Sequence, residues 1–164
     1  MANLFFIPQY VISGENAMKT SMDHLVTFGE KALVVTDNAM VSLGNVKKLT
    51  DALEAAEIKF LVYDEINTEP THTMIDKGVG LYTTEGCDFL IALGGGSPID
   101  AMKAIGAVVA NGGVICDYMG KRSKNVCRIC VRFPRRRAPV PKRRRSRSLP
   151  TRTPMSRCCS ATRS

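Results

Sequence analysis

The residue types that could do chemistry are densest in "LIALGGGSPIDAMKAIG", residues 90–106. Here an apolar run ends in glycines 94–96. Glycines let a phosphate approach the backbone closely, and the unpaired N–H groups of a helix start favour negative charge. We expect Ser97 to be the N-cap, Pro98 the first helical residue and Asp100 part of the first turn. The stretch predicts a phosphate-binding turn, or a plain tight turn in which Asp100 stabilises its own helix dipole.

A second candidate is Asp37, the last residue of "KALVVTD" at residues 31–37. In open parallel sheets ligands bind at the carboxyl ends of the strands, where a carboxylate can accept hydrogen bonds from ribose hydroxyls. The alternative is an Asx turn with Asn38. The glycine spacing fits neither G-x-G-x-x-G nor the G-K-[ST] of a P-loop. Taken alone, these residues leave both interpretations open.

The segments that position these residues alternate between strand and helix. Short apolar runs predict strands, and apolar residues at helical spacing predict helices. The expected strands are 31–37, 59–66 and 87–96, and the expected helices are 46–58, 70–86 and 97–113. This order predicts an α/β fold with a parallel sheet and helices on both faces. Residues 3–14 are expected to form a strand or a pair of strands, and 15–29 a helix closed by Gly29.

Charge divides the chain sharply at residue 120. Residues 1–120 carry 15 acidic residues against seven lysines, a net of −8, whereas residues 121–164 carry 16 basic residues and no acidic one. A nucleic-acid-binding interpretation of the overall charge of +8 therefore applies only to the tail. No apolar run approaches the roughly 20 residues of a membrane span, and the start lacks the basic flank of a signal peptide. We expect a soluble, cytoplasmic protein.

The combination of "VVTDNAM" and "GGGSPIDAMKAIG" resembles the N-terminal nucleotide-binding domain of the iron-containing (group III) alcohol dehydrogenases, over residues 1 to about 120. The resemblance implies a Rossmann-like NAD(P)-binding domain. It places Gly95, Gly96 and Ser97 against the pyrophosphate, and Asp37 at the adenosine ribose, where an aspartate tends to favour NAD over NADP. Glu69 stands where the family often has an asparagine near the cofactor.

The same resemblance extends to the start of the following helix. "DAMK" departs slightly from the commoner D-T-A-K, but Asp100 and Lys103 are kept. In the family a second, helical domain supplies an aspartate and histidines to a divalent metal, usually iron. That metal polarises the alcohol oxygen so that hydride passes between a primary alcohol or aldehyde and nicotinamide. His24 and His72 match no such ligand, so we expect no catalytic or metal residue here and an inactive fragment of an often homo-oligomeric enzyme.

The tail departs from the resemblance after "DYMGK", where the family continues with K-E-I-E-K-x-L-P and I-P-T-T-A-G-T-G. Plausible codons for the residues from Phe133 onward, regrouped one base earlier, read I-P-T-T-A-G-T-G-T-E. The same operation on residues 121–128 gives K-E-I-E-K-R-L-P. We therefore expect a domain at 1–120 and a disordered, out-of-frame tail at 121–164, after one base was lost near the codons of Gly120 and Lys121. The alternative is a genuine basic arm that binds nucleic-acid phosphates without sequence specificity.

Overall fold

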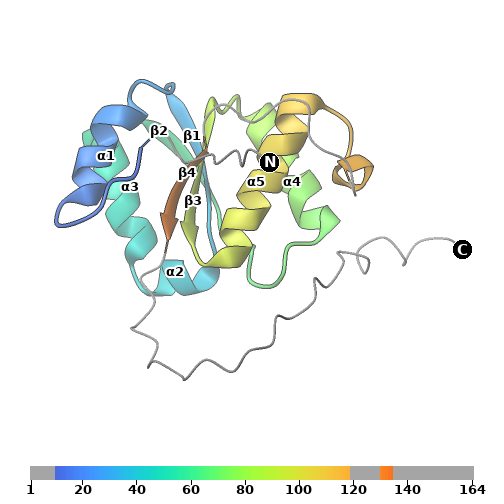
Figure 1. Ribbon diagram of the computed structural model, residues 1–164, viewed down its shortest axis with the longest axis horizontal. Helices are drawn as coiled ribbons and strands as arrows, with labels where there is room; N and C mark the ends of the chain where they lie inside the picture. The colour runs from blue at the N-terminus through green and yellow to red at the C-terminus, as the bar shows by residue number, and fades with distance from the viewer. Residues whose placement is uncertain (1–9, 119–129, 135–164) are drawn as a thin grey trace, which may run out of the picture.

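The computed structural model of the protein describes residues 10–118 and 130–134. In this part a parallel sheet is flanked by helices on both faces, which confirms the predicted α/β class (Figure 1). The strands are β1 (Lys31–Val35), β2 (Lys59–Tyr63), β3 (Phe89–Gly94) and β4 (Cys130–Pro134). The helices are α1 (Ala17–Leu25), α2 (Asn38–Ser42), α3 (Asn45–Ala55), α4 (His72–Thr84) and α5 (Gly96–Asn111), followed by a 3-10 turn at Ile115–Tyr118.

The central strands are apolar throughout because both of their faces are covered. The strand order is β2-β1-β3-β4. Every residue of β3 is buried, and so is every residue of β1 after Lys31. β2 lies at the edge of the sheet, where Lys59 is exposed and only Tyr63 is buried. A strand that is buried on both faces reads as a continuous hydrophobic run rather than as an alternating pattern, as these two strands do.

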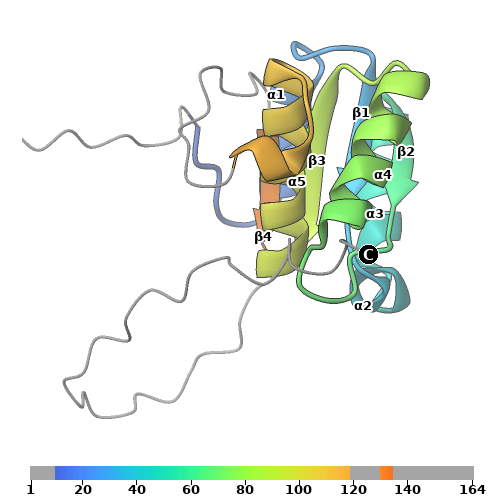
Figure 2. The same cartoon turned by 90° about the vertical axis from the view of Figure 1, so that its right-hand side faces the viewer.

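Two hydrophobic cores lie on opposite faces of the sheet. On one face, α1 and α3 contribute Leu25, Leu49 and Leu53 to the core. On the other face, α4 and α5 pack side by side, and α5 contributes Met102 and Ile105 (Figure 2). Full burial of a side chain of this size stabilises a fold by about 1.5–3 kcal/mol. Because each core includes side chains of both β1 and β3, the helices hold these two strands in a fixed relation.

The amino-terminal edge of the sheet is tied together by one carboxylate. Oδ2 of Asp88 accepts hydrogen bonds from the backbone N–H groups of Glu30 (2.7 Å) and Lys31 (2.9 Å). Gly29 has φ +150°, and a Cβ at this position would lie 2.4 Å from Cβ of Asp88. The prediction that Gly29 closes the first helix is wrong, because α1 ends at Leu25 and Gly29 instead makes room for Asp88 at the start of β1.

The structure also differs from the expected boundaries at both ends of the described region. Residues 10–13 form no strand, and residues 3–9 lie outside the described residues. In the tail, which was expected to be disordered, residues 130–134 form β4 parallel to β3. Val131 and Phe133 pack against the core under α1 and α3, while Arg132, between them, is exposed. This alternation suits an edge strand, and the remaining tail residues lie outside the described part.

Candidate functional site

The chain order of the strands creates a switch point between β1 and β3. From β1 the chain moves to β2 on one side, and β3 then returns to the opposite side of β1. In open α/β sheets, ligands bind in the crevice outside the carboxyl ends of two such strands. Asp37 follows the end of β1, and Gly95 follows the end of β3. The structure thus brings together the two features that the sequence singled out.

The three glycines after β3 have different surroundings. Gly94 is buried with φ +146°, and a Cβ there would lie 3.0 Å from Cγ of Pro98 and 3.1 Å from Oδ2 of Asp37. Gly95 and Gly96 are exposed, and a Cβ at either position would meet nothing within 4 Å. The fold therefore requires glycine at 94, because a side chain would be strained there. At 95 and 96 the absent side chains leave open space beside the start of α5.

The start of α5 differs from the prediction. The helix begins at Gly96 with Gly95 as its N-cap, and no side chain caps it, so the prediction that Ser97 is the N-cap is wrong. Ser97 and Pro98 occupy the second and third helical positions, and Asp100 lies beyond the first turn. Proline is tolerated there because the first four N–H groups of a helix have no partner within it. The uncapped amides at this end can receive an anion.

Asp37 has a structural role in addition to its place at the site. Its Oδ1 accepts a hydrogen bond from the N–H of Met40 at 2.8 Å, which makes Asp37 the N-cap of α2. The residue is half-buried, and its Oδ2 faces the position of Gly94. The expected break at residues 38–45 thus contains a short helix. The carboxylate caps this helix with one oxygen and faces the glycine-rich turn with the other.

Two further predicted residues, Glu69 and Asp100, make local contacts. Glu69 is exposed in the loop between β2 and α4, where its carbonyl accepts a hydrogen bond from the hydroxyl of Thr68 at 3.3 Å. Asp100 is exposed and forms an ion pair with Lys103 at 2.8 Å on the same helix. Asp100 does not lie in the first turn, where it was expected to stabilise the helix dipole, and its exposed ion pair contributes little to stability.

Sequence reasoning missed two residues that join the loops of this edge. Oδ1 of Asn67, after β2, accepts a hydrogen bond from the N–H of Asn38 at 2.8 Å, beside the cap of α2. The hydroxyl of Thr36 is buried and donates a hydrogen bond to the carbonyl of Leu93 at 2.8 Å. The signal for Thr36 is visible in the sequence, because a hydroxyl residue ends the otherwise apolar run "ALVVT".

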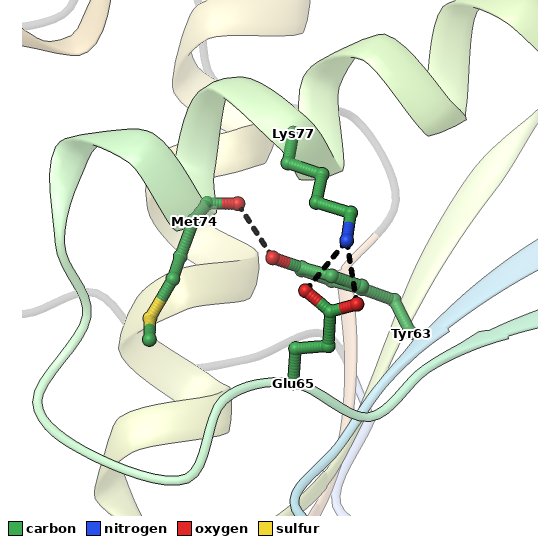
Figure 3. Close-up of polar contacts among 4 residues, drawn as sticks. All are labelled: Tyr63, Glu65, Met74 and Lys77. Atoms are coloured by element: carbon green, nitrogen blue, oxygen red, sulfur yellow. Dashed lines mark hydrogen bonds and ion pairs between the residues drawn. The ribbon is translucent and has the colours of Figure 1, made fainter.

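Figure 3 shows the polar contacts that join β2 to α4. The hydroxyl of Tyr63 donates a hydrogen bond to the carbonyl of Met74 at 2.9 Å, and Nζ of Lys77 lies 2.5 and 2.7 Å from the carboxylate oxygens of Glu65. Burial raises the pKa of the Tyr63 hydroxyl above its ordinary value, and the negative charge of Glu65 raises it further. These contacts fix the helix that follows the Glu69 loop.

The described residues do not fit a metal centre. Within residues 10–118 and 130–134, no three His, Cys, Asp or Glu residues gather closely enough to hold a metal ion. The ring of His24 stacks on Tyr10 with centroids 4.6 Å apart, and His72 is the first residue of α4. No reaction step through a metal follows from the side chains of this part of the chain.

The fold and this edge define a doubly wound, Rossmann-like α/β domain with a glycine-rich turn at its switch point. The family model described as iron-containing alcohol dehydrogenase matches residues 8–133, and the chain belongs to this family. Lactaldehyde reductase of Escherichia coli (strain K12) is 39% identical over 112 residues, which are 68% of this chain and 29% of that protein. NAD-dependent methanol dehydrogenase of Bacillus methanolicus is 38% identical over 120 residues, 73% of this chain and 32% of that one.

A solved structure shows the same fold. The crystal structure of an iron-containing alcohol dehydrogenase superposes with a TM-score of 0.72 at 27% identity, over 80% of this chain and 37% of that chain. The chain thus spans about a third of the length of the relatives it matches. None of the helices in the described part is long and apolar enough to cross a membrane.

Proposed function

We propose that this chain binds NAD at the switch point between β1 and β3, with the pyrophosphate against Gly95, Gly96 and Ser97. The observation that carries the proposal is the open space over Gly95 and Gly96, next to an uncapped helix start and a carboxylate. A phosphate can approach backbone without side chains, and the N–H groups and dipole of α5 favour its negative charge. A capped turn built only for stability would not need glycine at these two open positions.

Asp37 supplies the proposed preference for NAD over NADP. Its capping bond to Met40 fixes the carboxylate, leaving Oδ2 on the side of the glycine-rich turn. A carboxylate in this place can accept hydrogen bonds from the ribose hydroxyls, whereas the 2′-phosphate of NADP would meet it charge against charge. Glu69, in the loop after β2, is proposed to line the outer part of the same crevice. Asp100, beyond the first turn of α5, completes the proposed set.

For the whole protein we propose the oxidoreductase chemistry of its relatives, with a primary alcohol or aldehyde as substrate. The two relatives named above are a lactaldehyde reductase and an NAD-dependent methanol dehydrogenase. In this proposal the present chain contributes the part that holds the nicotinamide dinucleotide. Hydride transfer is the chemistry of the cofactor, and the residues described here bind and orient it. The iron of the family would need ligands other than those in the described residues.

Titration of the full 164-residue chain with NAD⁺ by isothermal calorimetry tests the cofactor proposal. Gly96→Val fills the open space over the turn, so we expect the Kd to rise about tenfold or more, the effect of losing about 1.4 kcal/mol of binding. The thermal unfolding of this variant should change little, because a Cβ at 96 meets no atom of the protein. Asp37→Asn is expected to keep the cap of α2 and lose the discrimination against NADP⁺. Unchanged affinity in Gly96→Val would contradict the proposal.

The tail supports a second candidate function, binding of nucleic acid. Residues 121–164 hold 16 basic residues and no acidic one, and such a segment attracts phosphate backbones with a strong dependence on salt. We propose instead that this segment is translated from a shifted reading frame and has no evolved binding function. The family match extends to residue 133, beyond the codons of Gly120 and Lys121, so this proposal rests on the regrouped codons, which spell I-P-T-T from Phe133 onward. Sequencing the gene across the codon of Gly120 tests this, and an alternative frame that closes at once contradicts it.

A further inference from the structure

Thr36 is buried between the carboxyl ends of three strands. It has 0% exposure, and in the described part Ser21 is the only other buried polar residue. Its N–H donates a hydrogen bond to the carbonyl of Tyr63 at the end of β2, at 2.9 Å. Its hydroxyl donates a hydrogen bond to the carbonyl of Leu93 near the end of β3, at 2.8 Å. A buried hydroxyl with no partner is costly, so this second bond determines how the side chain is placed.

The hydrogen bond from the Thr36 hydroxyl to Leu93 restrains the peptide group that leads into the glycine-rich turn. The carbonyl of Leu93 and the N–H of Gly94 belong to the same planar peptide unit, so a bond that holds the carbonyl also holds the plane from which Gly94 turns. The β1–β3 register ends at Val35 and Ala92, one residue before both partners of this bond. A side-chain hydroxyl thus continues the connection between the strands where the paired register has stopped.

The backbone conformation of Gly94 explains why a bond at this peptide matters. This residue adopts φ +146°, and glycine has the widest choice of backbone conformations of any residue. β4 pairs with β3 through Gly94 on one side, and the Thr36 hydroxyl holds the Leu93–Gly94 peptide from the side of β1. The peptide is thereby held from both sides where the chain turns toward Gly95 and Gly96. On the other side of the turn, Asp37 leaves β1 directly after Thr36 and places Oδ2 next to Gly94. Thr36 therefore connects the two halves of the proposed nucleotide site at their base.

We infer that Thr36 is a positioning residue for the nucleotide: its hydroxyl holds the Leu93–Gly94 peptide so that the turn is already shaped for the pyrophosphate. The inference rests on the proposed cofactor site and goes beyond it, because Thr36 is buried beneath the ligand and acts through the turn. If the turn holds the binding-competent arrangement in only a fraction of molecules, the apparent Kd rises by the inverse of that fraction.

The test compares variants of the full chain in NAD⁺ titrations, with circular dichroism as the measure of folding. Thr36→Val keeps the shape and removes the donor, and Thr36→Ser restores a hydroxyl. Tyr63→Phe is the matched control, because it removes another hydroxyl-to-carbonyl bond, the one from β2 to Met74 of α4. It leaves in place the backbone carbonyl of Tyr63 that accepts the hydrogen bond of the Thr36 N–H. If Thr36→Val weakens NAD⁺ binding and Tyr63→Phe does not, the effect comes from the shape of the turn and not from a general loss of stability.

We expect Thr36→Val to raise the Kd for NAD⁺ about tenfold, and Thr36→Ser and Tyr63→Phe to stay within about twofold of the wild type. Thr36→Cys, with a weaker donor of similar size, should be intermediate, and it serves as the deciding variant if Thr36→Val does not fold. Wild-type affinity in folded Thr36→Val or in Thr36→Cys would overturn the inference and leave the cofactor proposal standing. A wild-type chain that does not bind NAD⁺ would overturn both.

Discussion

At the scale of single residues, neighbours of the same type have different roles because their surroundings differ. Gly94 is buried against Pro98 and Asp37, while Gly95 and Gly96 face open space. Asp37 shows the converse, since one side chain both caps α2 and faces the turn. A structural and a functional interpretation of the same residue are therefore compatible here. The different surroundings of these glycines predict different effects of substitution on stability.

Gly94→Ala is expected to lower the free energy of unfolding by about 1–3 kcal/mol, because the new Cβ enforces strain at φ +146° and crowds Pro98. Gly95→Ala should leave it within about 0.5 kcal/mol, since this residue has φ −84° and an open environment. Urea unfolding followed by circular dichroism measures both. Equal midpoints for the two variants would show that the turn is not strained as described.

At the scale of elements, the position of α4 against α5 depends on one missing side chain. A Cβ on Gly78 would lie 2.4 Å from Cδ1 of Ile105, which is fully buried in the core between the two helices. On the same helix, Gly80 is exposed, and a Cβ there meets nothing within 4 Å. Helix α4 therefore contains one glycine that packing requires and one that it does not.

Two variants of α4 separate helix propensity from packing. Alanine in a helix interior is more favourable than glycine by about 0.5–1 kcal/mol, so Gly80→Ala should stabilise the protein by about that amount. Gly78→Ala gains the same propensity but overpacks the core at Ile105, and we expect a net loss of about 1–2 kcal/mol. Thermal unfolding monitored at 222 nm distinguishes them. Stabilisation by both variants would mean that Ile105 moves aside freely.

Two buried groups, the hydroxyl of Tyr63 and the thiol of Cys87, predict how the stability of the protein responds to alkaline pH. Burial raises the pKa of Tyr63 above 10.0, and that of the Cys87 thiol above 9.0. A group with a raised pKa in the folded state contributes its full stability below the unfolded value and loses it as pH rises through the folded value. The free energy of unfolding should therefore fall as pH rises above about 9. In Tyr63→Phe the part of this fall above pH 10 should be smaller, and an identical slope would contradict the assignment.

At the scale of the whole molecule, the sheet extends beyond the point where the charge of the chain changes. β4 pairs with β3 over five positions, and Val131 and Phe133 pack on the core next to α1 and α3. The acidic and the basic parts of the chain therefore meet within one sheet. β4 ends at Pro134, and most of the basic residues of the tail come later in the sequence. Truncation after Pro134 can therefore separate the proposed cofactor-binding domain from most of the basic residues of the tail.

A chain that ends after Pro134 is expected to keep the melting temperature and the NAD⁺ affinity of the full chain, and to lose salt-sensitive binding to double-stranded DNA. A chain that ends after Tyr118 also lacks β4, so Ile91 and Leu93 lose their neighbouring strand. We expect its melting temperature to fall by about 5 °C or more. Scanning calorimetry and fluorescence anisotropy at two salt concentrations measure these effects. DNA binding that survives the first truncation would exclude residues 135–164 as its source.

Much of this architecture could be predicted from local pattern. The strands appear as apolar runs because burial on both faces permits no polar alternation, and the helices appear through their spacing. Helix starts were predicted less well. Ser97 has the side chain of an N-cap, but α5 begins earlier, at Gly96. The local preference for Ser97 was overridden because β3 delivers the chain to the helix through the left-handed turn at Gly94.

The alternation of strands and helices, the glycine-rich turn and the change of charge at residue 120 could be read directly from the amino-acid order, because each depends on residues close together in the chain. Tertiary structure alone decided that Asp37 faces Gly94, that Thr36 bonds Leu93, and that residues 130–134 complete the sheet. Each of these contacts joins segments many residues apart. The physical reason is that such partners meet only when the helices pack the strands into one sheet, and no local pattern records which strand lies beside which.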